Sequence, residues 1–197
     1  MTLHKTNTIL VDADGVLFDW EHGFDRFMQD QGFVYQPNGQ DQYLMHLRYN
    51  CDAATAKKKI KQFNESPDIE FLPPLRDAVK YVRLLRAEGW RFHCITSLSD
   101  LAVAKDRRRR ALDREFGPGI IETLTCLDTG ADKDQALEPF KDSGLWWVED
   151  KPENADVGHA IGLRSILVNH AHNRSHQCAY PRVNNWHKIY QIITGQP

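Results

Sequence analysis

The sequence predicts an α/β fold in which a parallel β-sheet is flanked by helices. Three observations predict it: short β-branched apolar runs recur along the chain, segments with helical spacing lie between them, and glycines follow those segments. Such runs are typical of strands buried on both faces, and strands that alternate with helices favour parallel pairing. The predicted strands are Thr8–Asp12, Arg91–Thr96, Ile121–Leu127, Leu145–Glu149 and Ser165–Asn169.

Four helices are predicted between and after the strands, each with a signal at one end. Glycine, which favours the left-handed backbone that ends a helix, follows three of them. Side chains that accept hydrogen bonds from free N–H groups precede two. The helices run from Leu75 to Leu85 before Gly89, from a cap at Ser99 or Asp100 to Phe116 before Gly117, from Glu153 to Ile161 before Gly162, and from a cap at Asn185 through Trp186, Ile189, Tyr190 and Ile193.

The interval after the first strand breaks this alternation. Aromatic and apolar residues have helical spacing from Trp20 to Met28, and Asp52 is placed to cap a second helix that ends near Phe63. The pair Pro73–Pro74 marks the return to alternating elements. We expect residues 1–19 and 73–197 to form the α/β core, and residues 20–72 to form a small helical cap inserted after the first strand.

The composition excludes some classes of function. A chain of 197 residues suits one domain with a small insertion, and a net charge of −2 recruits neither nucleic acid nor anionic membranes. No window has the uncharged apolar length that a membrane span needs. The cysteines Cys51, Cys94, Cys126 and Cys178 form no C-x-x-C pair, which favours reduced thiols in a cytoplasmic protein over two buried disulfides.

Two aspartates mark the end of the first strand. Asp12 and Asp14 stand where the strand becomes a loop that contains Gly15. One carboxylate can attack phosphorus and form an acyl phosphate, and a second can protonate the leaving oxygen and then deprotonate water. Repulsion and burial would raise the pKa of one of them enough for it to begin as the acid. A surface turn or a calcium-loop fragment is the alternative, but the flanking ILV and VLFD segments favour the catalytic interpretation.

Hydroxyl groups and a lysine supply two further sites. Thr96 and Ser97 follow FHCI, where a hydroxyl can donate to a phosphoryl oxygen without adding charge; helix capping is the alternative role. Lys133 can offset the negative charge around a phosphoryl group, whereas an isolated lysine that opens a helix is usually exposed. Lys141 and Lys151 are the alternatives to Lys133.

Acidic residues also follow the fourth predicted strand. Glu149 and Asp150 come directly after WWV, where adjacent carboxylates are costly unless a cation compensates them. Carboxylate oxygens favour Mg²⁺. An acidic helix N-terminus is the alternative, and it accounts for Glu153 better than for the strand-end pair. Because ligands of parallel sheets bind beyond the carboxyl ends of the strands, we expect these sites to converge.

In this order, the four sites resemble the motifs of the haloacid dehalogenase superfamily. DADGVLFD resembles the first motif, ITS the second, the segment around Lys133 the third and VEDKPEN the fourth, so the resemblance spans Thr8 to about His170. It implies a Rossmann-like core and a phosphatase that works through a covalent aspartyl phosphate. Asp12 would be the nucleophile and Asp14 the general acid/base, since relatives that act as dehalogenases lack this second aspartate.

The resemblance also implies a magnesium site. Its ligands would be the carboxylates of Asp12 and Asp150 and the backbone carbonyl of Asp14, with Glu149 acting through water and Asn154 supporting the loop. Thr96 and Lys133 would complete the catalytic residues, with Ser97 beside them as a substrate-binding residue.

Within the superfamily, the chain is most similar to the 5′(3′)-deoxyribonucleotidase group. The similarity rests on DADGVLFDW, FLPPLRDAV, ITS, VEDKPEN, and VNHAHNR followed by NNWHKIYQII, although members often read DMDGVL and DDRPEN. It implies a nucleoside monophosphate as the small phosphorylated partner, and Tyr43 and Tyr49 of the cap are candidates to stack on its base. The alternatives are a sugar-phosphate or phosphoglycolate phosphatase, a polynucleotide end phosphatase, and a catalytically silent nucleotide-binding protein.

Two clusters are assigned no function. The run Lys105–Arg110 is interpreted as a solvated helix face, although it is the one feature that favours a polynucleotide substrate. The histidines His170, His172, His176 and His187 are interpreted as incidental loop residues, because neither a cysteine pair nor a helical H-x-x-x-H supports zinc.

Overall fold

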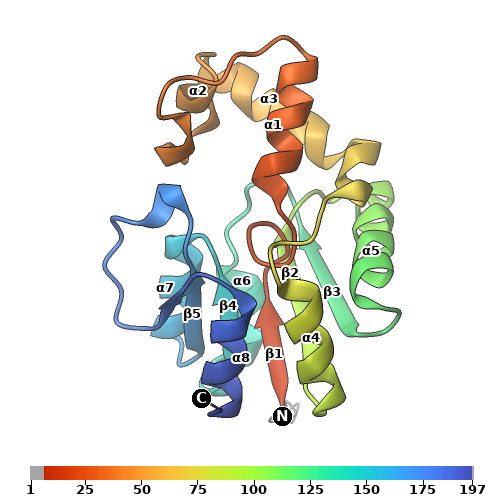
Figure 1. Ribbon diagram of the computed structural model, residues 1–197, viewed down its shortest axis with the longest axis vertical. Helices are drawn as coiled ribbons and strands as arrows, with labels where there is room; N and C mark the ends of the chain where they lie inside the picture. The colour runs from red at the N-terminus through yellow and green to blue at the C-terminus, as the bar shows by residue number, and fades with distance from the viewer. Residues whose placement is uncertain (1–6, 197) are drawn as a thin grey trace.

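The computed structural model describes residues 7–196. Its six strands form one parallel sheet in the order β3-β2-β1-β4-β5-β6, so the predicted α/β fold is confirmed (Figure 1). The five predicted strands are present with ends shifted by no more than one residue, and β6 is additional. The strands are β1 (Thr8–Val11), β2 (Arg91–Ser97), β3 (Ile121–Leu127), β4 (Trp146–Glu149), β5 (Arg164–Val168) and β6 (Arg182–Val183).

Helices connect the strands and cover both faces of the sheet. Successive side chains of a strand point to opposite faces. In β1, Ile9 and Val11 join the core beneath the final helix, whereas Leu10 packs on the other face with Trp147. The helices are α1 (Trp20–Asp30), α2 (Met45–Arg48), α3 (Ala53–Asn64), α4 (Ala78–Ala87), α5 (Ala102–Phe116), α6 (Asp134–Leu137), α7 (Pro152–Ala160) and α8 (Trp186–Thr194), with short 3₁₀ turns η1 (Gly39–Asp41), η2 (Pro67–Phe71), η3 (Glu138–Phe140) and η4 (Ala171–Asn173).

The helices α1, α2 and α3 form a layer over the carboxyl ends of the strands (Figure 1). Aromatic rings fill this layer: Phe24 and Phe63 are fully buried with ring centroids 5.5 Å apart, and Trp20 stacks on Phe24 at 4.7 Å. Asp52 caps α3 by accepting a hydrogen bond from the Thr55 N–H, as predicted. The cap segment therefore closes over the edge of the sheet at which the predicted sites meet.

Two helix starts differ from the prediction. Helix α4 begins at Ala78, not near Leu75, because the two prolines and a left-handed Arg76 with φ of 47° interrupt the chain there. Helix α5 follows Leu101, which provides no capping side chain, and the Ser99 hydroxyl instead accepts a hydrogen bond from the Leu101 N–H at 3.2 Å. The predicted cap at Asn185 is correct, since its side chain accepts from the Lys188 N–H.

Two expectations drawn from composition can be compared with the structure. The four cysteines are free thiols, as predicted. Among residues 7–196, no helix combines the length and the apolar character needed to cross a membrane.

Candidate active site

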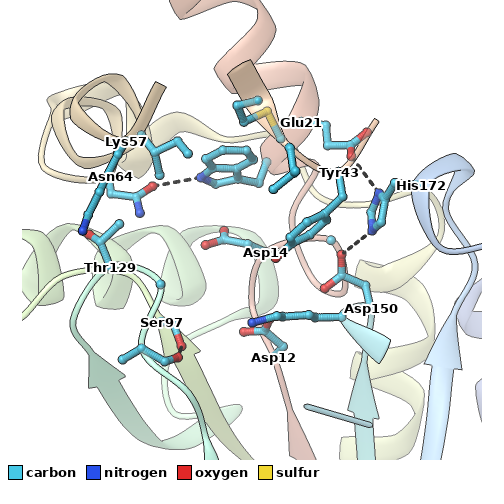
Figure 2. A pocket seen from close by; sticks show the side chains of 18 of the residues that line it. Asp12, Asp14, Glu21, Tyr43, Lys57, Asn64, Ser97, Thr129, Asp150 and His172 are labelled. Carbon is cyan, nitrogen blue, oxygen red and sulfur yellow. Dashed lines mark hydrogen bonds and ion pairs between the residues drawn. The ribbon is translucent and has the colours of Figure 1, made fainter. Parts of the chain in front are cut away.

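The predicted polar residues meet at a cavity of about 560 Å³ between the carboxyl ends of the strands and the cap. Asp12 follows β1, Thr96 and Ser97 end β2, and Asp150 follows β4. All four line this cavity, and Figure 2 shows Asp12, Ser97 and Asp150 on the side opposite the cap residue Lys57. The parallel sheet is what brings these residues, distant in the sequence, to one edge.

Lys133 lies beneath the cavity and joins two acidic residues. Its side chain is 2% exposed, and its Nζ lies 2.9 Å from Asp12 Oδ2 and 2.8 Å from Glu149 Oε2. Burial would lower the pKa of this lysine, but the two carboxylates raise it above its ordinary value, so Lys133 stays charged. The alternatives make other contacts: Lys141 pairs with Glu138 on the surface, and Lys151 lies 3.9 Å from Asp132.

Glu149 is the fixed point of the loop after β4. Its Oε1 accepts hydrogen bonds from the N–H groups of Asp150 and Lys151, both at 3.0 Å, and its Oε2 also accepts from Asn154 Nδ2 at 3.3 Å. Burial would raise the pKa of Glu149, yet Lys133 and these donors hold it below its ordinary value. Both carboxylate oxygens of Glu149 therefore accept hydrogen bonds. In this way the VEDKPEN motif fixes the positions of Lys133 and Asp150.

The charges at the site do not balance without a cation. Asp12, Glu149 and Asp150 each offer an oxygen within 4.8 Å of the others. Within the described part of the chain Lys133 is the one lysine or arginine that pairs with them, so three carboxylates face one ammonium. Burial raises the pKa of Asp12 to about 7, although Lys133 opposes this. Burial and the neighbouring carboxylates also raise the pKa of Asp150 well above its ordinary value.

This donor set fits a magnesium ion. Three carboxylates and one ammonium leave an excess of two negative charges, which a divalent cation would neutralise, and carboxylate oxygens are the ligands Mg²⁺ prefers. Gly15 keeps the loop open for Asp150: its φ is 74°, and a Cβ there would come within 2.3 Å of Asp150 Oδ2. Only glycine accommodates both that backbone angle and that approach.

The two hydroxyl residues are placed differently. Thr96 is 1% exposed and lies under the cavity. The Ser97 hydroxyl donates to the backbone carbonyl of Ala131 at 2.7 Å, which ties the end of β2 to the loop that carries Lys133. Both side chains therefore reach the cavity, and Ser97 also holds the loop in place.

Asp14 points toward helix α5. Its Oδ1 accepts from Arg108 Nη2 at 2.6 Å, and the Arg108 side chain is fully buried. The expectation that the arginine run forms a solvated face is therefore wrong for Arg108. Its neighbours also bond within the protein: Arg107 donates to the Glu65 carbonyl, Arg109 to the Ile121 carbonyl, and Arg110 to Glu70.

The cap side of the cavity is mainly apolar. Tyr43 is 48% exposed and its ring lies 5.3 Å from the His172 ring. The structure contradicts the expectation for Tyr49, which is 2% exposed, donates its hydroxyl to Asp25 and packs inside the cap. The cap residues that line the cavity include Trp20, Tyr43, Leu44, Met45, His46, Ala56, Lys57, Ile60 and Asn64.

The sequence interpretation missed a link between cap and core. His172 Nδ1 lies 3.1 Å from Glu21 Oε1, and its Nε2 lies 3.9 Å from Asp150 Oδ2 (Figure 2). Hydrogen bonds from His172 and from Arg48 lower the pKa of Glu21 to about 2, against the effect of burial. The interpretation of His172 as incidental is therefore wrong. The similarity of VNHAHNR to the nucleotidase group was the one available signal.

Asn64 makes a second link between the cap and the core. Its side chain accepts from Trp20 Nε1 at 2.9 Å and donates to the Leu98 carbonyl at 3.0 Å. Thr129 donates to the same carbonyl from the Lys133 loop. The cap is thus hydrogen-bonded to the core on both sides of the cavity.

Comparisons with known proteins agree with this geometry. A curated relative, an uncharacterized 32.4 kDa protein in the Gp30-rIII intergenic region of enterobacteria phage T4, is 26% identical over 168 residues, which is 82% of this chain and 59% of the phage protein. The chain thus spans less than two thirds of that relative.

Solved structures show the same fold at low sequence identity. A haloacid dehalogenase-like hydrolase from Streptococcus pneumoniae has a TM-score of 0.67 and 11% identity, covering 94% of this chain and 97% of its own. A magnesium-bound haloacid dehalogenase-type hydrolase, YfnB from Bacillus subtilis, has a TM-score of 0.60 and 12% identity, covering 96% and 99%.

The family comparison covers nearly the whole chain. Residues 6–196 match a family described as 5′ nucleotidase, deoxy (Pyrimidine), cytosolic type C protein. The six-stranded parallel sheet and the strand-end carboxylates are those expected of the larger superfamily. The chain therefore belongs to this nucleotidase family, within the haloacid dehalogenase superfamily of phosphatases.

Proposed function

We propose that the protein is a magnesium-dependent phosphate monoester hydrolase that acts on nucleoside monophosphates, with deoxynucleotides preferred. The observation that carries this proposal is a single cavity with buried carboxylates and a lysine on its core side and apolar and aromatic side chains on its cap side. The family match supports it, because the matched family is described as a deoxy, pyrimidine 5′ nucleotidase.

Asp12 is the nucleophile in this proposal. Its carboxylate attacks phosphorus, the bond from phosphorus to the leaving oxygen breaks, and Asp14 gives that oxygen a proton. Asp14 then takes a proton from water, and the water oxygen attacks phosphorus and releases Asp12 and inorganic phosphate. Each step conserves charge and protons because Asp14 alternates between its acid and base forms.

The other core residues hold the phosphoryl group and the nucleophile. Lys133 contacts Asp12 at 2.9 Å and keeps a positive charge where negative charge gathers. At the end of β2 the Thr96 hydroxyl is available to donate to a phosphoryl oxygen, and the Ser97 hydroxyl can do so once it gives up its bond to the Ala131 carbonyl. In this arrangement Lys133 and the hydroxyls orient the phosphoryl group toward Asp12.

Mg²⁺ would be held by the carboxylates of Asp12 and Asp150 and by the backbone carbonyl of Asp14, with Glu149 acting through water. When bound, it neutralises phosphoryl charge and fixes the nucleophile relative to phosphorus. Glu149 also acts directly on this chain's own residues, since it fixes Lys133 and the loop that carries Asp150.

The cap side is proposed to bind the nucleoside. Tyr43 presents a half-exposed ring at the cavity, and stacking of a base on an aromatic ring is worth about 1–3 kcal/mol in nucleic-acid complexes. A sugar phosphate would leave its hydroxyl groups against a mainly apolar surface. A polynucleotide substrate loses its support, because the arginine run bonds within the protein.

A substrate comparison tests the proposal. We expect kcat/KM to be highest for dUMP and dTMP, lower for AMP, and lowest for glucose 6-phosphate and phosphoglycolate. A ranking led by a sugar phosphate or by phosphoglycolate would reject the nucleotide assignment while leaving the Asp12 mechanism intact. Absence of turnover with all of these and with p-nitrophenyl phosphate would indicate a silent binding protein. We also propose a cytoplasmic location, which is supported by the cytosolic type of the matched family.

A further inference from the structure

A buried arginine of helix α5 holds one of the proposed catalytic carboxylates. The Arg108 side chain has no solvent exposure, and its Nη2 lies 2.6 Å from Asp14 Oδ1, whose side chain is 20% exposed. The two residues are 94 positions apart in the chain. The pair is therefore made by the packing of α5 against the loop after β1, and not by local sequence.

Asp14 is the one acceptor that Arg108 reaches among the described residues. Its Nε and Nη1 are buried without a hydrogen-bond partner, and its guanidinium carbon lies 5.1 Å from the centre of the Phe18 ring. A buried cation with unused donors is costly to retain for stability alone, and an apolar side chain of similar size would avoid that cost. This indicates that the contact with Asp14 has a purpose other than stability.

The contact fixes one oxygen of Asp14 and leaves the other free. Oδ1 is taken by Arg108, whereas Oδ2 makes no hydrogen bond with any residue in the range 7–196. Asp14 also lines the cavity, and Figure 2 shows its carboxyl group beneath the cap, away from Asp150. An anchored Oδ1 restricts the rotation of the carboxyl group, so Oδ2 is the oxygen left to meet a leaving group.

The helix that carries Arg108 is itself held against the cap. Arg107 donates to the Glu65 carbonyl at 2.6 Å, at the end of α3. Arg110 makes two hydrogen bonds to Glu70, at 2.9 and 2.6 Å, in the segment that returns from the cap. The stretch of α5 before and after Arg108 is thus tied to the cap. A side chain that orients another needs such a rigid support.

We propose that Arg108 is a positioning residue that orients Asp14 to protonate the leaving-group oxygen. This inference rests on the proposed function, in which Asp14 transfers that proton as the bond from phosphorus to oxygen breaks. Arg108 touches neither substrate nor phosphorus and acts only through Asp14. Its loss therefore matters most for substrates whose leaving oxygen is too basic to depart without a proton.

A series of substituted phenyl phosphates tests the inference, because these substrates are similar in size and differ in the basicity of the leaving oxygen. We would plot log kcat/KM against the pKa of the leaving phenol for wild type, Arg108→Met and Arg108→Gln. For both variants we expect a steeper negative slope. For phenyl phosphate the loss should exceed that for p-nitrophenyl phosphate by about tenfold, which is part of the 10²–10⁴-fold that general acid–base catalysis contributes as a whole. Arg108→Lys should have a slope between that of wild type and that of Arg108→Met.

Matched variants separate positioning from folding. Arg114→Met removes a partly exposed ion pair with Glu115 from the same helix and should leave the slope unchanged. In an Asp14→Asn background, which should itself steepen the slope, Arg108→Met should add nothing to it, since residues that act through one group are not additive.

Each outcome decides a different point. Parallel losses for all substrates, or an unchanged slope, in a folded Arg108 variant would overturn the inference and leave the role of Asp14 standing. If the slope for Asp14→Asn equals that of wild type, the proposed role of Asp14 is overturned, and the inference with it. If Arg108→Met does not fold, Arg108→Gln and Arg108→Lys decide the question by the same slopes.

Discussion

The two sides of the cavity differ in how tightly their residues are held. On the core side, Lys133 and Glu149 are buried, and Glu149 accepts four hydrogen bonds from groups fixed by the sheet and its loops. On the cap side, Tyr43 is 48% exposed and Lys57 is exposed with no ion pair among residues 7–196. The core residues come from strand ends, whereas the cap residues come from short helices and a loop.

This difference suggests a division of work. Groups that must meet phosphorus with accurate geometry are placed where burial and hydrogen bonds fix them. Groups that contact the rest of the substrate lie on a surface that can change without disturbing the first set. Substitutions on the core side should therefore abolish turnover of every substrate, and substitutions on the cap side should change which substrate is preferred.

The largest effect is expected at Asp12, the proposed nucleophile. Asp12→Asn should lower kcat by about 10³-fold or more for nucleotides and for p-nitrophenyl phosphate alike, because an amide cannot form the acyl phosphate. Steady-state kinetics with a phosphate-release assay would measure this, and circular dichroism would check the fold. Activity close to that of wild type would contradict the statement that core-side substitutions abolish turnover of every substrate.

Removal of the metal should have an effect nearly as large. EDTA should abolish activity, Mg²⁺ should restore it, and Asp150→Ala should raise the Mg²⁺ requirement or remove activity. Calcium should inhibit, since its looser and larger coordination misplaces the nucleophile. A titration of activity against Mg²⁺ would measure this, and full activity in calcium or in chelator would contradict the magnesium assignment.

A selective effect is expected at the cap. Tyr43→Ala should raise KM for dUMP by about tenfold, consistent with the loss of one stacking contact, and should leave kcat/KM for p-nitrophenyl phosphate nearly unchanged. Tyr43→Phe keeps the ring and serves as the matched control. Equal losses of kcat/KM for dUMP and p-nitrophenyl phosphate in Tyr43→Ala would show that Tyr43 does not act selectively on the nucleoside.

The smallest effect is on stability. Burial raises the pKa of Asp12 to about 7, so the folded state keeps a proton that the unfolded state releases near pH 4. The stability that this proton brings is present at low pH and is lost as pH rises through about 7. In EDTA, the melting temperature of Asp12→Asn minus that of wild type should therefore increase from pH 5 to pH 8. If this difference in melting temperature stays constant or decreases from pH 5 to pH 8, burial of the Asp12 carboxylate is not unfavourable.

The sequence predicted the core side better than the cap side. Strand ends are marked by apolar runs, so polar residues such as Asp12 and Asp150 that follow them stand out, and a parallel sheet places them at one edge. Lys133 was identified only by its place in the series, yet its partners Asp12 and Glu149 were both among the predicted residues.

Contacts between distant segments could not be predicted. Tyr43 and Tyr49 have similar surroundings in the sequence, and only the folded cap shows that one faces the cavity and the other its interior. Arg108 looks like its neighbours in an arginine run, because helix periodicity does not reveal which face meets the loop after β1. His172 carried no spacing signal for its contacts with Glu21 and Asp150.

The covalent intermediate on Asp12 is the central claim, and trapping it is the most direct test. With p-nitrophenyl phosphate, whose leaving group needs no proton, the Asp14→Asn variant should still form the acyl phosphate, and it should accumulate it because it lacks the base that activates water. Borohydride should then reduce that acyl phosphate to an alcohol. Peptide mass spectrometry after incubation of this variant with p-nitrophenyl phosphate, Mg²⁺ and borohydride should find Asp12 converted to homoserine, and should find no conversion when p-nitrophenyl phosphate is omitted. The account would be contradicted if wild type turned over p-nitrophenyl phosphate while the trapped variant showed an unmodified Asp12 and reduction at another carboxylate.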